Sequence, residues 1–269
     1  MVLDNSKVTV RVAYPDLKTP ASSQVIATID PEQVEIDDIA DFALPGKLLV
    51  HATFDFSGSD LTYALHGSGG YADAPGDGFN GYKINFAKLA DETNRISLHA
   101  VDIVAGLNTF NLDRSSIRFD RDSLFLNMDA VRAPYGSEFT LRFGFAIDGT
   151  AGSNQLKGDA GRDKLSSFDG DDRLSGGDGA DTLNGGRGAD TLIGGLGRDT
   201  FVLREGSGND LVTDFQNGID RILIRTTDDR FADLTIIEVE AGVRIRSDGE
   251  TILLRGADLS DINAADFIF

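Results

Sequence analysis

The sequence predicts an all-β protein in which an N-terminal antiparallel β-sandwich is followed by a parallel β-roll and a C-terminal β-rich cap. Three observations predict this class. Short runs of period-two alternation occupy residues 1–148, a nine-residue repeat occupies 149–202, and alternating β-branched segments occupy 203–269. We take these three ranges as the predicted domain limits, since a chain of 269 residues has room for more than one domain.

The first range alternates apolar and polar side chains over short runs, with Gly, Asp and Pro between the runs. This pattern predicts antiparallel strands with one face of each sheet buried, as in a β-sandwich. The segment 31–42 (PEQVEIDDIADF) is compatible with a short helix. The predicted strands lie around 8–12, 49–56, 97–103, 116–119 and 139–145.

One loop in this range stands out. The segment 67–82 is rich in Gly and Asp and carries Tyr71, Phe79 and Tyr82. Loops with aromatic side chains on a sandwich are common places for sugar-binding or partner-binding sites. The simpler interpretation is a flexible connection in which 79–82 begins the next strand.

Motifs of catalysis are missing from the sequence, and we predict no catalytic residue. The histidines His51, His66 and His99 are scattered and form no HExxH, and no GxSxG occurs. A histidine in this setting is most often structural. Without Cys there is no thiol chemistry and no disulfide. Acidic pairs such as Asp37 with Asp38 are too common here to indicate a glycosidase. Whether the protein is an enzyme therefore stays open, with the motifs pointing away from it.

The charge balance limits the possible partners. The chain has 25 Lys and Arg against 44 Asp and Glu, a formal charge of −19, which argues against binding to nucleic acid or to an anionic membrane surface. No stretch has the roughly 20 apolar residues of a membrane-spanning helix. The start, MVLDNSKVTVRV, lacks the basic and apolar regions of a cleaved signal peptide.

The second range consists of six nonapeptides in tandem. They share Gly at the fourth place, Asp or Asn at the sixth, and Leu or Phe at the eighth. In order they read GTAGSNQLK, GDAGRDKLS, SFDGDDRLS, GGDGADTLN, GGRGADTLI and GGLGRDTFV. A flexible Gly- and Asp-rich linker would explain the composition but not this register.

Each nonapeptide predicts one half-coil. Glycines in the first six places allow a tight half-turn whose carbonyl oxygens point inward, and the last three residues form a short strand. Two repeats then make one coil, so that every second repeat stacks on the same edge. One apolar side chain per repeat fills a thin core, and these eighth-place residues are Leu156, Leu165, Leu174, Leu183, Leu192 and Phe201.

The same stacking arranges the sixth-place residues in two ladders, one along each edge. Stacked carboxylates repel one another unless a cation lies between them. Calcium suits such a site because it accepts six to eight carboxylate and carbonyl oxygens in flexible geometry. Magnesium demands a tighter octahedron, and zinc prefers His and Cys, which the repeats lack. The ladders are Asn154, Asp172 and Asp190 on one edge and Asp163, Asp181 and Asp199 on the other.

Two repeats depart from the pattern. The first has Thr150 and Asn154 where Gly and Asp are expected, and we interpret it as a degenerate cap, since terminal repeats are often atypical. The third begins with Ser167 and Phe168, and the sequence leaves open whether this Phe points inward or outward.

The repeats resemble the G-G-x-G-x-D-x-U-x pattern of RTX proteins, and 149–269 as a whole resembles the C-terminal part of this group. The resemblance implies a calcium-binding β-roll in a protein secreted by a Gram-negative bacterium through a type I apparatus. Composition alone would suggest a cytosolic protein, but low-affinity calcium sites would stay empty there. The predicted ligands are residues at the first, third and sixth places of the repeats: Gly158, Ala160, Asp163, Ser167, Asp169, Asp172, Gly176, Asp178, Asp181, Gly185, Arg187, Asp190, Gly194, Leu196 and Asp199.

The third range predicts strands near 211–215, 220–225, 234–240, 242–247 and 250–255, with Asp248 and Gly249 in a hairpin turn. The run 208–224 resembles the segment that follows the repeats in serralysins. Asp210 and Asp220 there are either two further calcium ligands or solvated turn residues. The ending, Asp266 followed by Phe-Ile-Phe, resembles the uncleaved secretion signal of serralysin-type proteins, and it also fits a final strand.

Together these features predict a secreted calcium-binding protein that carries an N-terminal binding domain for a carbohydrate or for a cell-surface or matrix component. Two alternatives remain open. One is a secreted polysaccharide-active enzyme with catalytic carboxylates in the N-terminal domain, and the other is an inhibitor or self-assembly module.

Overall fold

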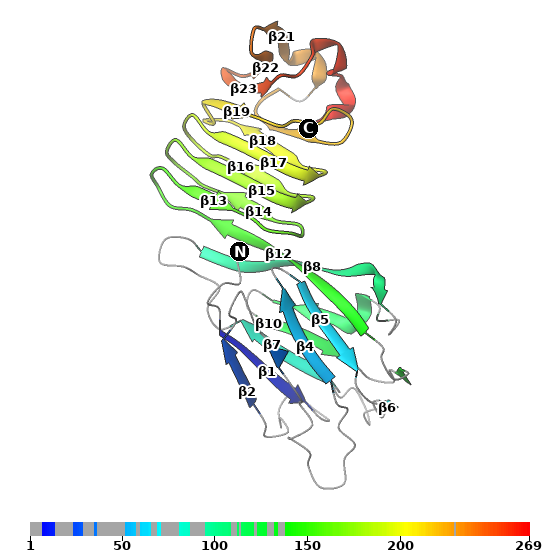
Figure 1. Cartoon of the computed structure of the whole chain (residues 1–269). Helices are drawn as coiled ribbons and strands as arrows, with labels where there is room; N and C mark the ends of the chain where they lie inside the picture. Colours follow the sequence, from blue (N-terminus) through cyan, green and yellow to red (C-terminus); the bar gives the residue numbers. More distant parts are fainter. Residues whose placement is uncertain are drawn as a thin grey trace. The chain divides into compact units, whose positions relative to one another are not determined.

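The computed structural model (Figure 1) divides the chain into two compact units, Met1–Leu89 with Leu98–Phe143, and Ala90–Ser97 with Gly144–Phe269. In the described residues the regular structure is β-strand, apart from 3-10 helices of three residues, so the all-β class is confirmed for them. No helix in this part of the chain is long and apolar enough to cross a membrane. The described residues are 7–13, 24–28, 35–36, 52–57, 60–65, 69–70, 81–86, 95–108, 112, 114–120, 123–127, 132–133, 138–228 and 230–269.

The strands of the first unit pair antiparallel. One sheet has the order β2-β1-β7-β10-β9, and a second series runs β3-β4-β5-β12. Each of the five predicted strand segments contains a strand, whereas the packing of two sheets as a sandwich stays a prediction. The elements are β1 (Lys7–Ala13), β2 (Gln24–Thr28), β3 (Glu35–Ile36), β4 (Ala52–Ser57), β5 (Asp60–Leu65), β6 (Gly69–Gly70), β7 (Gly81–Phe86), β8 (Arg95–Asn108), η2 (Arg114–Ser116), β9 (Ile117–Phe119), β10 (Ser123–Asn127), β11 (Arg132–Ala133) and β12 (Glu138–Asp148).

Side chains on β5 and β12 show why these two strands pair in one register. The Arg142 guanidinium makes two hydrogen bonds, of 2.8 and 2.7 Å, to the carboxylate of Asp60, which lies directly opposite. The hydroxyls of Thr62 and Thr140, another opposed pair, are 3.0 Å apart. Between them, Leu61 lies directly opposite Leu141, and both are fully buried, so the alternation seen in the sequence gives this strand pair one polar and one apolar face.

Two predictions for the N-terminal half are partly settled. Within 31–42 the residues Glu35–Ile36 form strand β3, paired with β4, so a helix there is wrong, because the backbone of these residues bonds to a neighbouring strand. In the 67–82 loop, β6 pairs with β11 and β7 begins at Gly81. The start of a strand at this end agrees with the simpler interpretation of the loop, and 71–80 lie outside the described residues.

The repeats form the predicted parallel β-roll (Figure 1). Each strand pairs in parallel with the strand 18 residues further along, so that alternate repeats stack on two separate sheets. On one sheet Leu156, Leu174 and Leu192 are aligned, and on the other Leu165, Leu183 and Phe201. All six are 0–2 % exposed. The strands are β13 (Gln155–Lys157), β14 (Lys164–Ser166), β15 (Arg173–Gly179), β16 (Thr182–Asn184), β17 (Thr191–Gly197) and β18 (Thr200–Arg204).

The roll begins one strand earlier than the repeats. The end of β12 pairs in parallel with β14, which aligns the buried Ile147 with Leu165. The same strand therefore takes part in the antiparallel pairing with β5 through its first residues and in the roll through its last. The first nonapeptide supplies β13, which lies at the edge of its sheet, in keeping with a cap.

The C-terminal segment continues both sheets of the roll. Strand β19 pairs in parallel with β17 and β23, and β20 with β18 and β24. The first predicted strand is shorter than expected and ends at Val212, and Asp248 and Gly249, both with positive φ, form the predicted hairpin turn between β22 and β23. The elements are β19 (Asn209–Val212), β20 (Arg221–Arg225), η3 (Phe231–Asp233), β21 (Thr235–Val239), β22 (Gly242–Ser247), β23 (Glu250–Arg255), η4 (Leu259–Asp261), η5 (Ala264–Asp266) and β24 (Phe267–Ile268).

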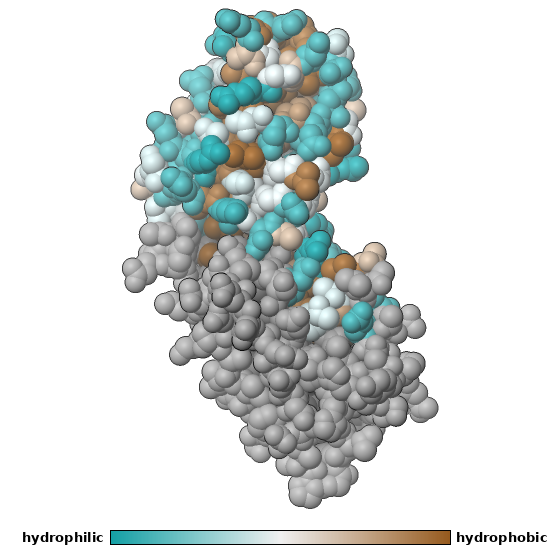
Figure 2. Space-filling view, viewed as in Figure 1, coloured by the Kyte–Doolittle hydropathy of each residue, from teal (hydrophilic) through white to brown (hydrophobic). Residues whose placement is uncertain are grey.

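The surface of this unit mixes hydrophilic and hydrophobic residues (Figure 2). Phe168 is 49 % exposed, which answers the question left open by the sequence: its side chain points outward. Its φ of 71° lies in the left-handed region of backbone conformations. Phe168 occupies the second place of its repeat, which is Gly in repeats four to six. Leu196 is 68 % exposed.

Candidate metal centre

The sixth-place residues lie in the two predicted ladders and are joined through the backbone. One carboxylate oxygen, Oδ1, of each Asp accepts a hydrogen bond from the backbone N–H of the residue one coil earlier. In the middle of the roll, the N–H of Asp163 donates to Asp181 (2.8 Å), and the N–H of Asp181 donates to Asp199 (3.0 Å). The same bond joins Phe145 to Asp163, Asn154 to Asp172, and Asp172 to Asp190.

The ladders extend beyond the repeats into the C-terminal segment. Asp210 accepts from the N–H of Asp190 (3.2 Å), and Asp220 accepts from the N–H of Asp199 (2.9 Å). Both side chains are at most 3 % exposed, so they are not solvated turn residues. They take the positions that a further repeat would supply.

The second carboxylate oxygen, Oδ2, is buried without a hydrogen-bond partner along most of both ladders. This holds for Asp172, Asp181, Asp190, Asp199 and Asp210. At the two ends of one ladder the oxygen has a partner instead: Asp163 Oδ2 accepts from the N–H of Asp159 and Asp220 Oδ2 from the N–H of Gln216, both at 2.8 Å. Buried polar atoms without partners are rare in native proteins, so a row of them indicates a missing ligand.

Burial also changes the acidity of these groups. Loss of solvation, together with the neighbouring charges of Asp163 and Asp199, raises the pKa of Asp181 to about 7. The same loss of solvation raises the pKa of Asp163, Asp190 and Asp199 to about 6, and that of Asp210 to about 8, with a contribution from the charge of Asp190. The ionised ladders are therefore unfavourable unless a cation compensates them.

The first-place glycines show where carbonyl oxygens join the carboxylates. A Cβ on Gly176 would lie 2.3 Å from Asp181 Oδ2 and 2.7 Å from the carbonyl oxygen of Gly194. A Cβ on Gly158 would meet Asp163 Oδ2 at 2.4 Å and the Gly176 carbonyl oxygen at 2.2 Å. A carboxylate oxygen and a carbonyl oxygen of the following coil thus converge beside each of these glycines, and no larger residue fits there.

This donor set fits calcium. In the described residues, no three His, Cys, Asp or Glu side chains lie close enough together to hold a metal ion, so a cation on the ladders must take backbone carbonyls as well. An all-oxygen set of carboxylates and carbonyls is typical of calcium and unsuited to zinc. The buried Oδ2 atoms are the atoms that such an ion would contact.

The third-place residues have a different setting. The carbonyl oxygens of Asp169, Asp178 and Arg187 accept hydrogen bonds from the N–H groups of fourth-place glycines one coil earlier, at 2.8 Å or less. Asp178 pairs with Ala160 in an isolated bridge. The third-place carbonyl oxygens are thus bound to backbone N–H groups of the neighbouring coil. The sixth-place carboxylates, in contrast, lie beside the first-place glycines. The role of the first-, third- and sixth-place residues as calcium ligands stays a prediction.

Two acidic residues that the sequence analysis missed bind backbone N–H groups at the end of the roll. The carboxylate of Asp214 accepts from Gly194 (3.0 Å) and Gly195 (2.9 Å). The carboxylate of Glu250 accepts from Gly206 and Gly208 at 3.0 and 2.5 Å. Neither residue belongs to the nine-residue register, so no periodic signal marks it.

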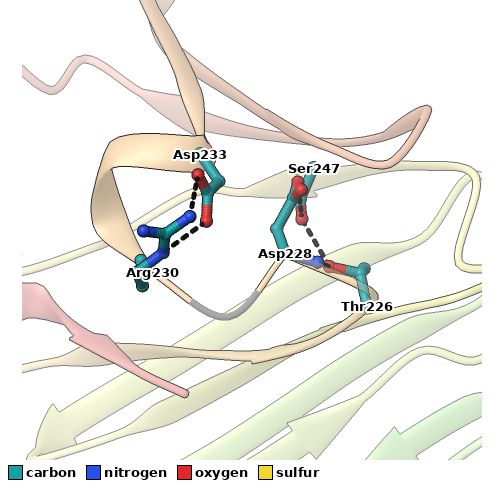
Figure 3. Close-up of polar contacts among 5 residues, drawn as sticks. All are labelled: Thr226, Asp228, Arg230, Asp233 and Ser247. Carbon is teal, nitrogen blue, oxygen red and sulfur yellow. Dashed lines mark hydrogen bonds and ion pairs between the residues drawn. The ribbon is translucent and has the colours of Figure 1, made fainter.

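A second polar cluster fixes the chain after β20 to the β22–β23 hairpin (Figure 3). Asp228 accepts from the Ser247 hydroxyl (2.8 Å), which also lies 2.5 Å from the Thr226 hydroxyl. Arg230 pairs with Asp233 through two bonds of 3.1 Å. The Ser247 hydroxyl and the Arg230 guanidinium both donate to a carboxylate within this cluster, which indicates a structural role.

Of the three histidines, the structure describes one. His99 is exposed on β8, and His51 and His66 lie outside the described residues. In the part of the chain that the structure describes, they form no group with acidic residues that could hold a metal.

The coils, the ladders and the oxygen donor set define this unit as a calcium-binding parallel β-roll. The family model of the RTX calcium-binding nonapeptide repeat, with four copies, matches residues 148–182 and 166–201. The chain therefore carries RTX repeats, as predicted, and repeats of this family bind calcium. No curated protein matches the chain.

Solved structures give two partial likenesses. The AlgE6R3 subunit of the Azotobacter vinelandii mannuronan C5-epimerase has 25% identity, a TM-score of 0.34, and a match that covers 45% of this chain and 80% of that one. The extracellular lipase LipA from Serratia marcescens has 18% identity and a TM-score of 0.36, with 71% of this chain covered. This chain spans 29% of the lipase.

Proposed function

We propose that the protein is secreted by a Gram-negative bacterium and that its β-roll folds when it meets extracellular calcium. The proposal rests on one observation above all: buried Oδ2 atoms without partners run along both ladders. We further propose that 149–202 is the calcium-binding domain, that 203–269 caps it, and that 1–148 is a binding domain for a carbohydrate or for a cell-surface or matrix component.

The mechanism follows from linkage. A ligand that binds only the folded state stabilises it by RT ln(1 + [L]/Kd), which is about 2.7 kcal/mol per site at a hundredfold excess over Kd. Extracellular modules bind calcium with Kd values near 10⁻⁴–10⁻³ M, whereas cytosolic sensors need far tighter sites. Inside the cell the stabilisation is lost, and the unfolded roll is suited to passage through a type I secretion apparatus.

Calcium titration of the whole chain tests this proposal. We expect far-ultraviolet circular dichroism to show a gain of β-structure with calcium, and the melting temperature to rise with calcium but much less with magnesium. Chelator should reverse both effects. An identical spectrum and melting temperature in chelator and in millimolar calcium would contradict the proposal.

The role of 1–148 needs a separate test. We expect the calcium-loaded protein to bind members of a glycan array without changing them. Turnover of a polysaccharide in a parallel activity screen would favour the enzyme, and capture of a protein from culture supernatant would favour an inhibitor or assembly module.

A further inference from the structure

The outer face of the C-terminal hairpin carries a pocket of about 450 Å³ that is lined by three arginines. The arginines are Arg244 and Arg246 on β22 and Arg255 on β23. All three are exposed, while the residues between them, Val243, Ile245 and Leu254, are buried. Period-two alternation therefore directs the three guanidinium groups to the same outer face.

The strand register brings these arginines close together over an apolar floor. Arg244 lies opposite Leu253, and Leu253 in turn lies opposite Leu211 of β19. Arg255 lies opposite Gly242, which places it diagonal to Arg244, at a typical Cα separation of about 7–8 Å. Arg246 is two residues from Arg244, about 7 Å along the strand.

In the described part of the chain these arginines have no carboxylate or other hydrogen-bonding partner, in contrast to Arg142 and Arg230, whose ion pairs are 2.7 and 3.1 Å long. The acidic residues nearest in the strands bind elsewhere. Glu250 accepts from Gly206 and Gly208, and Asp210, at the pocket wall, accepts from Asp190. In a chain of net charge −19, three neighbouring guanidinium groups without an ion pair among the described residues form a cationic patch, with the buried Asp210 at its edge.

We propose that this pocket binds an anionic saccharide, that is, a sugar chain with carboxylate or sulfate groups. A guanidinium group binds a carboxylate or a sulfate through two parallel charge-assisted hydrogen bonds, which are stronger than hydrogen bonds between neutral groups. Leu211 and Leu253 offer an apolar surface to the C–H face of a sugar ring, and the volume falls in the range typical of small-molecule sites. Three cations in a row, with the Cα atom of Arg244 about 7 Å from those of Arg246 and Arg255, favour a ligand with several anionic groups over a single small anion. This site adjoins the end of one calcium ladder at Asp210, and it adds to the proposed function.

Isothermal titration of the full chain at saturating calcium tests the proposal. The probes are a galacturonate tetrasaccharide, a sulfated chondroitin tetrasaccharide, a neutral tetrasaccharide and inorganic sulfate. We expect one or both acidic tetrasaccharides to bind, and the one that binds more tightly identifies the anionic group. Equal binding of the neutral sugar, equally tight binding of inorganic sulfate, or no binding of either acidic sugar would overturn the proposal.

Two matched double variants separate the pocket from general charge. We expect Arg244→Gln with Arg255→Gln to weaken binding roughly tenfold or more, since each arginine contributes charge-assisted hydrogen bonds. Arg221→Gln with Arg225→Gln removes the same charge from exposed positions on β20 and should leave affinity within about twofold. Both variants should keep the wild-type calcium-dependent spectrum. Equal losses in the two variants would show that no pocket is involved.

Discussion

Each sixth-place aspartate has two oxygens with separate tasks. Oδ1 accepts from the backbone N–H of the preceding coil and so aligns the coils, as in the bond from Asp163 to Asp181. Oδ2 of Asp181 has no partner and lies where the Gly194 carbonyl oxygen converges. An amide at this position would keep the first task and lose the second.

Asp181→Asn is therefore expected to change the protein in opposite directions with and without calcium. In chelator at pH 8 the variant should melt at a higher temperature than the wild type, because burial raises the pKa of the Asp181 carboxyl to about 7 and the amide has no charge to bury. In saturating calcium the variant should melt at a lower temperature, because a ligand oxygen is gone. Differential scanning calorimetry in both buffers measures the two shifts.

Asp169→Asn is the matched control, since its side chain is exposed and its carbonyl is kept. It should leave both melting temperatures within about 1–2 °C of the wild type, as surface substitutions usually do. A variant Asp181→Asn with an undiminished calcium response would show that this carboxylate is not a ligand.

The end of the roll is held by side chains that belong to other elements. Asp214 follows β19 and accepts hydrogen bonds from the N–H groups of Gly194 and Gly195, in the middle of β17. The bulky Phe215 beside it lies 6.3 Å from the ring of Phe201, the last eighth-place residue. The segment after the repeats thus replaces the coil that would follow.

Asp214→Ala should lower the free energy of unfolding by about 1–3 kcal/mol, because two backbone N–H groups lose their acceptor. Urea unfolding in saturating calcium is the appropriate measurement, since the charge of Asp214 also raises the pKa of Asp199 and Asp220 when no cation is bound. Asp261→Ala, at an exposed residue of η4, should change it by less than about 0.5 kcal/mol. Equal unfolding curves for Asp214→Ala and wild type would show that the end of the roll does not depend on this carboxylate.

At the scale of the whole molecule, the raised pKa values of the ladders predict how stability depends on pH. Their folded pKa values, about 6 to 8, exceed the value of 3.8 for an ordinary Asp. The folded state therefore holds more protons than the unfolded state between about pH 4 and pH 8, so its stability falls as pH rises through this window.

In chelator the melting temperature should thus decrease from pH 5 to pH 8. In saturating calcium it should increase over the same interval, because fewer protons compete with the ion for the carboxylates. Thermal melts in matched buffers at both calcium levels test the sign. A melting temperature in chelator that rises with pH would contradict the burial of these carboxyls.

Much of the roll was predictable because its core and ladder residues recur with a fixed period of nine. Leu or Phe at every eighth place and Asp or Asn at every sixth predicted the buried core and the two ladders, and Asp248 with Gly249 predicted the hairpin. The start of the roll in β12 was not predicted, although Ile147 stands nine residues before Leu156, because the segment lacks the glycines of a repeat.

The features that could not be predicted depend on single contacts between residues that lie far apart in the sequence and follow no period. Glu250 accepts hydrogen bonds from the N–H groups of residues more than 40 positions earlier. No local sequence pattern predicts such a bond. Of the three arginines of the pocket, Arg244 and Arg246 alternate in the sequence, but only the strand register shows that Arg255 shares their face.

The ladder bonds have a direction along the chain. In each of them the N–H belongs to the earlier coil and the carboxylate to the later one. The acceptors for each coil are therefore supplied by the coil that follows it. For the last two repeats they are supplied by Asp210 and Asp220, which lie outside the repeats. Because synthesis runs from the N-terminus, each coil lacks its carboxylate acceptors until the following coil has been made, so the roll cannot close coil by coil during synthesis.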